Sequence, residues 1–203
     1  MNLMLLSGKA WFWVVLVVLA GGTYALATRA NLNFRHRPGD VLDRLEGVAI
    51  YYNCGIHMTH GRNLAPDGYN LGIRYQCVEF VKSYLYERHG HRMPDAYGHA
   101  KDFFDPRLAD GQWNALRGMT QFANGSATKP ATGDLLVMRP WLFNRYGHVA
   151  IVAAVTGNSV EIAQQNPGPW GSTRAIYPLA IREGRWFIGQ RRVLGWLRLP
   201  TAE

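Results

Sequence analysis

The C-terminal third of the chain contains six short runs of β-forming residues with no helical run between them. Turn residues such as glycine, proline and asparagine separate the runs, which is typical of consecutive strands. The runs are GDLLVMRP, GHVAIVAAV, VEIAQQN, RAIYPLAI, RWFIGQ and VLGWLRL. Strands that follow one another without intervening helices commonly pair as antiparallel neighbours. The order therefore predicts an α+β fold with an antiparallel sheet and argues against a parallel βαβ sheet.

The predicted helices precede these strands. The segment CVEFVKSYLYERHG, residues 77–90, carries apolar side chains at helical spacing, and Gly90 is a suitable stop. A second short helix is predicted at residues 99–104. Residues 105–132 are rich in glycine, asparagine, alanine and proline, so we predict an irregular segment there.

The N-terminal segment is apolar enough to cross a membrane. Residues 10–28 include no charged side chain, and Lys9 precedes them. Ala25 and Ala27 form a small-x-small pattern of the kind that is cleaved after export. We therefore expect a protein that is either membrane-anchored through residues 10–28 or exported, with the periplasmic or cell-envelope side favoured.

Three segments follow from these patterns. Residues 1–27 are expected to be a signal peptide or a transmembrane anchor. Residues 28–46, which are polar and contain a Pro-Gly break, are expected to be a linker. Residues 47–203 are expected to form one domain, which is the simplest division for a chain of this length.

The chain is basic, with 22 Lys and Arg residues against 14 Asp and Glu residues and a net charge of +8. Such a charge favours an acidic partner: a nucleic acid, an anionic lipid or an acidic cell-wall polymer. Because the basic residues are scattered and the chain is expected to be tethered, we predict no nucleic-acid partner. We also expect a monomer.

Cys77 begins the predicted helix, and neither Tyr75 nor Gln76 is a preferred capping residue. The free N–H groups and the positive end of the helix dipole at such a position lower the pKa of a thiol. They also stabilise an oxyanion. The alternative is that Cys77 is a small buried apolar residue with no chemical role.

His148 opens the apolar run GHVAIVAAV, where an imidazole needs polar partners. It is therefore the candidate base for the thiol, although a structural histidine is the alternative. A third residue commonly orients such an imidazole. A two-residue turn before the next strand places Gln165 on the face of His148, whereas a bulge or an odd loop places Gln164 and Asn166 there. The pattern alone leaves both registers open.

The motifs YQCVEF, YGHVAIV and EIAQQN, in this order, resemble the CHAP domain family, the cysteine, histidine-dependent amidohydrolases/peptidases. The resemblance covers roughly residues 47–199 and is greatest to the branch with the amidase half of glutathionylspermidine synthetase. It implies a papain-like (NlpC/P60-type) fold, in which the helix that carries the nucleophile packs on an antiparallel sheet.

The resemblance also implies roles for individual residues. Cys77 would be the nucleophile and His148 its base, while the side chain of Gln76 would help to form the oxyanion hole. Gln164 aligns with the third catalytic residue, which is often Glu in this family, and Asn166 matches a supporting asparagine. Gln in place of Glu is a departure: an amide orients an imidazole, through Nδ1–H, but stabilises imidazolium less than a carboxylate does.

The expected reaction is hydrolysis of an amide through a thioester, with no cofactor and no metal. A thiolate–imidazolium pair is expected near neutral pH. For an exported domain we expect peptidoglycan peptides as substrate; the alternatives are small amides such as glutathionylspermidine, or an inactive CHAP-like module that only binds the cell wall. Tyr75, Trp113 and Trp170 are predicted to line the substrate groove, because loops commonly carry specificity.

The segment CGIHMTH raises the alternative of a zinc site at Cys54, His57 and His60. Its C-x2-H-x2-H spacing lacks the usual paired ligands, so a structural or incidental thiol is the preferred interpretation of Cys54. A disulfide between Cys54 and Cys77 is the other alternative; it would form only outside the cytoplasm and would silence the nucleophile.

Overall fold

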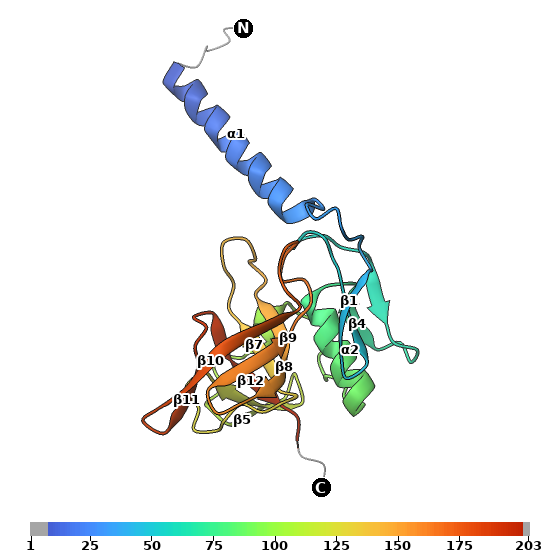
Figure 1. The fold of residues 1–203 in the computed structure, drawn as a ribbon, viewed down its shortest axis with the longest axis vertical. Helices are drawn as coiled ribbons and strands as arrows, with labels where there is room; N and C mark the ends of the chain where they lie inside the picture. The colour runs from blue at the N-terminus through green and yellow to red at the C-terminus, as the bar shows by residue number, and fades with distance from the viewer. Residues whose placement is uncertain (1–7, 201–203) are drawn as a thin grey trace.

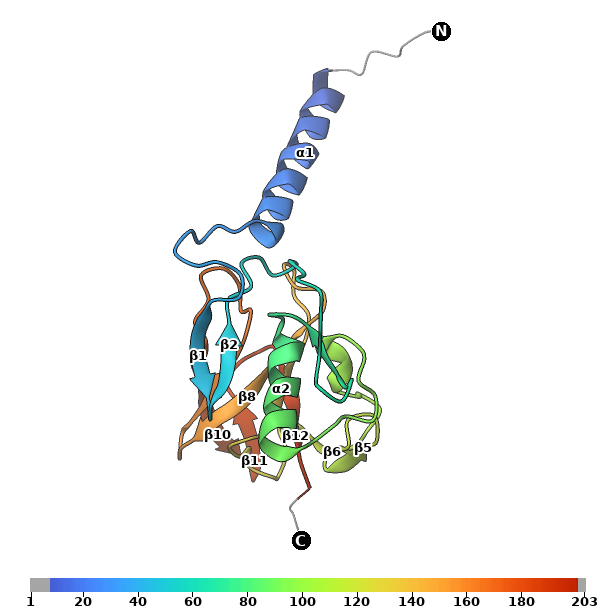
Figure 2. The same ribbon diagram turned by 90° about the vertical axis from the view of Figure 1, so that its right-hand side faces the viewer.

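The computed structural model describes residues 8–200, so the first seven residues of the predicted leader and the last three of the predicted domain lie outside it. An N-terminal helix projects from an α+β domain in which one helix packs against a large antiparallel sheet (Figures 1 and 2). The elements are α1 (Gly8–Arg29), β1 (Val41–Leu45), β2 (Val48–Tyr51), β3 (Arg62–Leu64), β4 (Asn70–Ile73), α2 (Cys77–His89), η1 (Ala100–Phe103), β5 (Gln112–Asn114), β6 (Met119–Ala123), β7 (Leu135–Met138), β8 (His148–Val155), β9 (Ser159–Ala163), β10 (Arg174–Arg182), β11 (Arg185–Ile188) and β12 (Val193–Arg198).

The large sheet has the strand order β11-β10-β9-β8-β7-β12-β6-β5, and every pairing in it is antiparallel. The six predicted strands are confirmed as β7 to β12, and the α+β class is confirmed. Two small hairpins, β1-β2 and β3-β4, lie outside this sheet.

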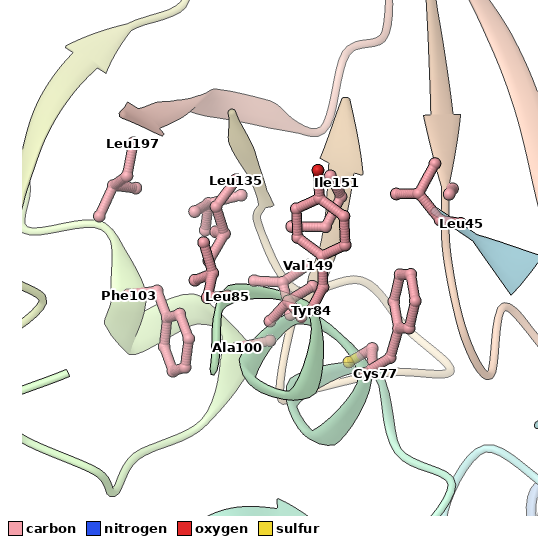
Figure 3. Close-up of a cluster of buried hydrophobic side chains, with 14 of the residues drawn as sticks. Leu45, Cys77, Tyr84, Leu85, Ala100, Phe103, Leu135, Val149, Ile151 and Leu197 are labelled. Carbon is pink, nitrogen blue, oxygen red and sulfur yellow. The ribbon is translucent and has the colours of Figure 1, made fainter. Parts of the chain in front are cut away.

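The sheet separates two apolar clusters. On one face, α2 and η1 cover side chains that include Val149 and Ile151 of β8 (Figure 3). On the other face, Ala150 and Val152 pack with Trp196 of β12. This alternation along β8 is what a strand buried on both faces requires, and it places Val149 on the face that packs against α2.

The helix prediction for residues 77–90 is also confirmed. Gly90 ends α2 in the left-handed conformation with φ of 62°, and its N–H donates to carbonyl groups of the last turn. A residue with a side chain is strained at such a φ, which explains why glycine ends the helix. The short helix predicted at residues 99–104 appears as the single 3-10 turn η1.

One prediction of irregular structure was wrong. Residues 105–132 contain β5 and β6, and the buried side chains of Met119 and Phe122 attach β6 to the sheet beside β12. The glycine and asparagine content of this segment belongs to the connections between the strands. The predicted linker, residues 28–46, contains β1, which pairs with β2, so ordered structure begins before residue 47. The boundary of the domain itself stays a prediction.

Helix α1 is apolar throughout, long enough to cross a membrane, and has none of its apolar window buried inside the protein. Length and composition alone fit both a membrane anchor and a signal sequence. Its C-terminal end nevertheless contacts the domain, because Thr28 is buried and its carbonyl accepts a hydrogen bond of 2.9 Å from the N–H of His57.

Candidate active site

Cys77 is the first residue of α2 and lies where this helix meets the start of β8 (Figure 3). Gln76 precedes it in an extended conformation and makes no side-chain cap. The sulfur is approached by the N–H groups of Cys77, Val78 and Val149, and the side chain is 7% exposed. The predicted position of a thiol at an uncapped helix start is therefore present, and the sulfur is next to the residue that follows His148.

A buried polar network holds the start of α2 in this position. The Gln165 side chain donates hydrogen bonds to the carbonyl of Gln76, at 3.0 Å, and to the Glu79 carboxylate, at 2.7 Å. Glu79 also accepts from the side chain of Asn63 and from the N–H of Tyr75. Burial raises the pKa of Glu79, while these donors oppose the rise.

Glu79 was not among the residues predicted to have a role in the site. The available signal was an acidic residue in the first turn of a helix, close to an expected oxyanion site. The network shows why Gln165 does not face the imidazole: it holds the backbone that carries Cys77.

His148 is oriented by Gln164. Its Nε2 lies 2.9 Å from Oε1 of Gln164, and both side chains are buried. The register that brings them together combines a two-residue turn, in which the N–H of Thr156 donates to Ser159, with a bulge at Ala153 in β8. Of the two open alternatives, the bulge is the one that occurs, and it places Gln164 rather than Gln165 beside the imidazole.

The hydrogen bonds of Gln164 also define the tautomer of the imidazole. The amide nitrogen of Gln164 donates to the carbonyl of Ser172 at 3.0 Å, so its oxygen must face His148. Because an amide oxygen only accepts, Nε2 of His148 carries the proton and Nδ1 is the basic nitrogen. The expectation that the third residue binds Nδ1–H was wrong, and Nδ1 is free to receive a proton.

Asn166 and Gln76 bind each other. The side chain of Asn166 donates to Oε1 of Gln76 at 2.7 Å and to the carbonyl of Ile56. The amide nitrogen of Gln76 donates to the carbonyls of Ile56 and Met58, at 3.2 and 2.6 Å. Asn166 therefore supports the loop around Ile56 and does not orient His148. Gln76, predicted to help form the oxyanion hole, thus has its amide nitrogen bonded to the 56–58 segment, and the backbone N–H groups at the start of α2 have no side-chain cap.

The predicted thiolate–imidazolium pair is corrected by the burial of both groups. Desolvation raises the pKa of Cys77 to about 11, although three backbone N–H groups oppose the rise. Desolvation also lowers the pKa of His148 to about 4, against the effect of its hydrogen bond with Gln164. Among residues 8–200, no hydrogen bond joins the sulfur to the imidazole. The resting site therefore contains a neutral thiol and a neutral imidazole.

A cleft of about 580 Å³ opens beside Cys77. Its lining includes Gln76 and Cys77, the 144–147 segment before His148, the 96–100 segment and the end of α1. The charged and titratable residues in this lining are Arg29, Arg62, Arg145, His57 and His99, together with Cys77, Tyr24, Tyr97 and Tyr146. No aspartate or glutamate within residues 8–200 lines the cleft, so its charge is positive.

The residues predicted to line the groove lie elsewhere. Trp113 is on β5, the edge strand farthest from β11 in the sheet. Trp170 borders a separate hollow of about 130 Å³ beside Tyr51 and Asn33. Tyr75 packs against the rings of Tyr51 and His60. These three residues are not among those that line the cleft, because packing brings the 56–62 and 96–100 segments to the thiol.

The alternatives for Cys54 are resolved by its surroundings. Cys54 and Cys77 are both buried and free, so the alternative disulfide is not formed. Across the described residues, 8–200, no group of three or more His, Cys, Asp or Glu side chains is arranged to hold a metal ion. His57 and His60 instead pack against tyrosine rings.

The fold and the site define a class of protein: an α+β domain with a thiol at the start of a helix and an amide-oriented imidazole at the start of an antiparallel strand. Residues 66–166 match the family model of the CHAP domain, and the chain belongs to this family. The resemblance drawn from the three motifs is thereby confirmed.

Two curated relatives extend the comparison. Over 196 residues the chain is 30% identical to trypanothione synthetase of Crithidia fasciculata, and the aligned region makes up 88% of this chain and 30% of that protein. Over 148 residues it is 32% identical to the bifunctional glutathionylspermidine synthetase/amidase of Escherichia coli (strain K12), and the aligned region makes up 67% of this chain and 23% of that protein. The chain therefore spans less than a third of the length of these relatives.

Among solved structures, that of a wild type endolysin, LysIME-EF1, superimposes with a TM-score of 0.38 and 22% identity, covering 69% of this chain and 58% of that chain.

Proposed function

We propose that this chain is a cysteine-dependent amidohydrolase in which Cys77 is the nucleophile and His148 is its base. The proposal is supported by the family of the domain and by the position of the thiol at the start of α2, next to Val149. It is also supported by the tautomer of His148, because Gln164 occupies Nε2 and leaves Nδ1 to take a proton.

The reaction starts from neutral groups. As the sulfur attacks the amide carbonyl, its proton passes to Nδ1 of His148, and the carbonyl oxygen acquires the negative charge. The amine then leaves with the proton from Nδ1, which yields a thioester on Cys77 and a neutral imidazole. Water, deprotonated by His148, hydrolyses the thioester and regenerates the thiol. The hydrogen bond of such a pair commonly forms only with substrate bound, and none joins the sulfur to the imidazole at rest among residues 8–200.

The backbone at the start of α2 is suited to the negative charge of the intermediate. Its first N–H groups lack side-chain caps, and the helix dipole is positive at this end. The network of Glu79 and Gln165 holds this backbone in place. In this mechanism Gln164, Gln165 and Glu79 are positioning residues. Only Cys77, which forms a covalent bond, and His148, which transfers protons, react with the substrate.

The substrate that the cleft favours is an acidic peptide, and the peptide stems and cross-links of peptidoglycan are of this kind. The observation that carries this choice is the lining of the cleft, which includes three arginines and, among the described residues, no carboxylate. Positive charge that lines a cleft concentrates anionic substrates and repels cationic ones.

The second candidate is an amidase for glutathione–polyamine conjugates. Sequence identity to a bifunctional glutathionylspermidine synthetase/amidase favours it. The cationic polyamine would have to bind beside Arg29, Arg62 and Arg145, which is unfavourable. A third candidate is a module that binds the cell wall without cleaving it, favoured by the amide of Gln164 where the family often has a carboxylate.

Hydrolysis assays with the full chain distinguish these functions. We expect cleavage of acidic peptidoglycan peptides, slower cleavage of the same peptides with amidated carboxyl groups, and no cleavage of glutathionylspermidine. Cys77→Ala and His148→Ala should abolish turnover, and Cys54→Ala, which removes the other thiol, should retain it. A thioester on Cys77 should be detectable by mass spectrometry.

Turnover that persists in Cys77→Ala would disprove the cysteine mechanism, and preference for the polyamine conjugate would disprove the substrate class. The contribution of the cleft is tested separately with Arg62→Gln, which should raise KM for the acidic peptide with little change in kcat. Arg185→Gln, on the exposed β10-β11 hairpin, is the matched control.

A further inference from the structure

The face from which α1 projects carries exposed apolar side chains that the proposed reaction does not use. Trp141 and Leu142 lie in the loop between β7 and β8, residues 139–147, and are 44% and 79% exposed. Phe34 and Trp170, in two further loops, are 89% and 69% exposed. Single exposed apolar residues are ordinary, whereas several on one face indicate contact with an apolar partner.

Aromatic contacts connect the 139–147 loop to the end of α1. The Phe143 ring stacks on Tyr24 of α1, with centroids 6.0 Å apart, and meets the Trp141 ring edge-on at 5.0 Å. Tyr24 also lies 6.2 Å from the ring of His57. The loop and the last turns of α1 therefore form one packed unit, and Figures 1 and 2 show the 139–147 loop reaching toward the base of α1.

The other two exposed rings lie on loops that are joined near the same base. The side chain of Asn33, four residues beyond the end of α1, donates a hydrogen bond of 3.0 Å to the carbonyl of Pro169. Phe34 and Trp170 are the next residues in the two loops. Three separate segments thus present exposed aromatic side chains around the point where the apolar helix ends.

The charges around these rings are basic. Residues 29–37 and 139–147 contain five arginines and no aspartate or glutamate. The arginines are Arg29, Arg35, Arg37, Arg139 and Arg145. In addition, the guanidinium of Arg192 lies over the Trp141 ring at 5.4 Å. Tryptophan and arginine side chains are the groups that anchor proteins at the boundary between lipid and water.

We propose that α1 is retained as a membrane anchor and that the face around its base lies on the surface of an anionic bilayer, with the 139–147 loop inserted among the headgroups. The end of α1 supplies Tyr24 and Arg29 to the wall of the catalytic cleft. The cleft therefore opens at the membrane surface, and its substrate is taken from the layer next to the lipid. Cleavage after Ala27 would remove Tyr24 and with it the contact that fixes the 139–147 loop.

The orientation is tested with a fluorescent label and lipid-borne quenchers. The full chain carrying Cys77→Ala is reconstituted in vesicles of phosphatidylcholine and phosphatidylglycerol, and an environment-sensitive dye is attached at Leu142→Cys. The matched control is Ile181→Cys, at a position that is also exposed but lies near the tip of the β10-β11 hairpin, away from α1 (Figure 1). Because the protein is inactive, the outcome does not depend on the proposed reaction.

A nitroxide on the lipid headgroup should quench the dye at position 142, and aqueous iodide should quench the dye at position 181. Equal quenching of both dyes by iodide, with no effect of the lipid nitroxide at position 142, would overturn the proposal. The intact mass of the chain purified from membranes should include α1, and a mature chain that begins at or beyond Thr28 would also overturn it. Thermal unfolding of both labelled proteins confirms that the fold is retained.

Discussion

Replacing Gln164 with glutamate places a carboxylate where this chain has an amide, 2.9 Å from Nε2 of His148. At roughly 4 Å between charge centres, an imidazolium–carboxylate pair gains about 4 kcal/mol with an effective dielectric constant of about 20. Two effects oppose this gain: the carboxylate must lose water, and one of its oxygens meets the carbonyl of Ser172, which now accepts a hydrogen bond from the amide. Ser172 is exposed, so its loop has room to relax.

The net result of Gln164→Glu should be a rise in the pKa of His148 by roughly 1 to 3. In the wild-type chain, burial lowers this pKa to about 4, so the acidic limb of the kcat/KM profile should lie near pH 4. In the variant the limb should move toward neutral pH, and the plateau should be higher because imidazolium is stabilised in the transition state.

The pH dependence of kcat/KM, and NMR titration of the His148 ring with His148→Ala for assignment, measure the two effects independently. Asn158→Asp is the control, because it makes the same change from amide to carboxylate in an exposed turn far from the site. An unchanged titration of His148 in Gln164→Glu would refute the electrostatic reasoning, and an unchanged plateau with a shifted titration would refute the role of imidazolium in the transition state.

Three further predictions concern reactivity and stability. With a thiol pKa of about 11, Cys77 should react with iodoacetamide about a hundredfold more slowly at pH 7 than the unfolded chain's thiols, and the rate should still rise above pH 9. A rate that reaches its plateau below pH 8 would instead indicate a thiolate–imidazolium pair at rest. The pKa of His148 is lower in the folded state than its usual 6.5, so its contribution to stability is present above pH 6.5 and is lost as the pH falls toward 4. The wild-type chain should therefore lose unfolding free energy between pH 7 and pH 4, measured in urea, and His148→Gln should make this loss smaller by about 3 kcal/mol. A loss as large as that of the wild type would contradict the buried neutral imidazole. Gly195→Ala would bring a Cβ into the carbonyl oxygen of Phe122, inside a strand paired on both sides, so it should destabilise the fold by roughly 3 kcal/mol or more in thermal unfolding. Gly157→Ala, with open space around it, should be close to wild type, and similar melting of both variants would show that β12 shifts freely.

The parts of the fold that the sequence predicted are those with a strong local signal. Alternation and turn residues mark the six strands from β7 to β12, and helical spacing with a terminal glycine marks α2. The strands β5 and β6 are short, and their assignment depends on Met119 and Phe122 being buried against strands from the end of the chain. A local pattern does not contain that long-range contact.

The site shows the same division. The motifs identified Cys77, His148 and Gln164, because these residue types stand at recognisable ends of a helix and two strands. The bulge at Ala153 decided between Gln164 and Gln165, and a single extra residue in a strand has no clear signature in sequence. The burial that makes both reacting groups neutral arises from the packing of α2 on the sheet, so the charge state was predicted incorrectly.

The amide of Gln164 and the neutral state of the site fit together physically. A carboxylate in that buried position would favour an imidazolium at rest, and it would need a donor where the structure offers the carbonyl of Ser172. An amide satisfies both neighbours without a buried charge, since its oxygen accepts from His148 and its nitrogen donates to Ser172. In such a site the negative charge of the reaction appears only during attack, at the start of α2, and the positive charge that attracts substrate is kept in the cleft, on Arg29, Arg62 and Arg145. Binding and proton transfer are then separate functions of separate residues, which is why Arg62→Gln should alter KM and Gln164→Glu should alter the pH profile.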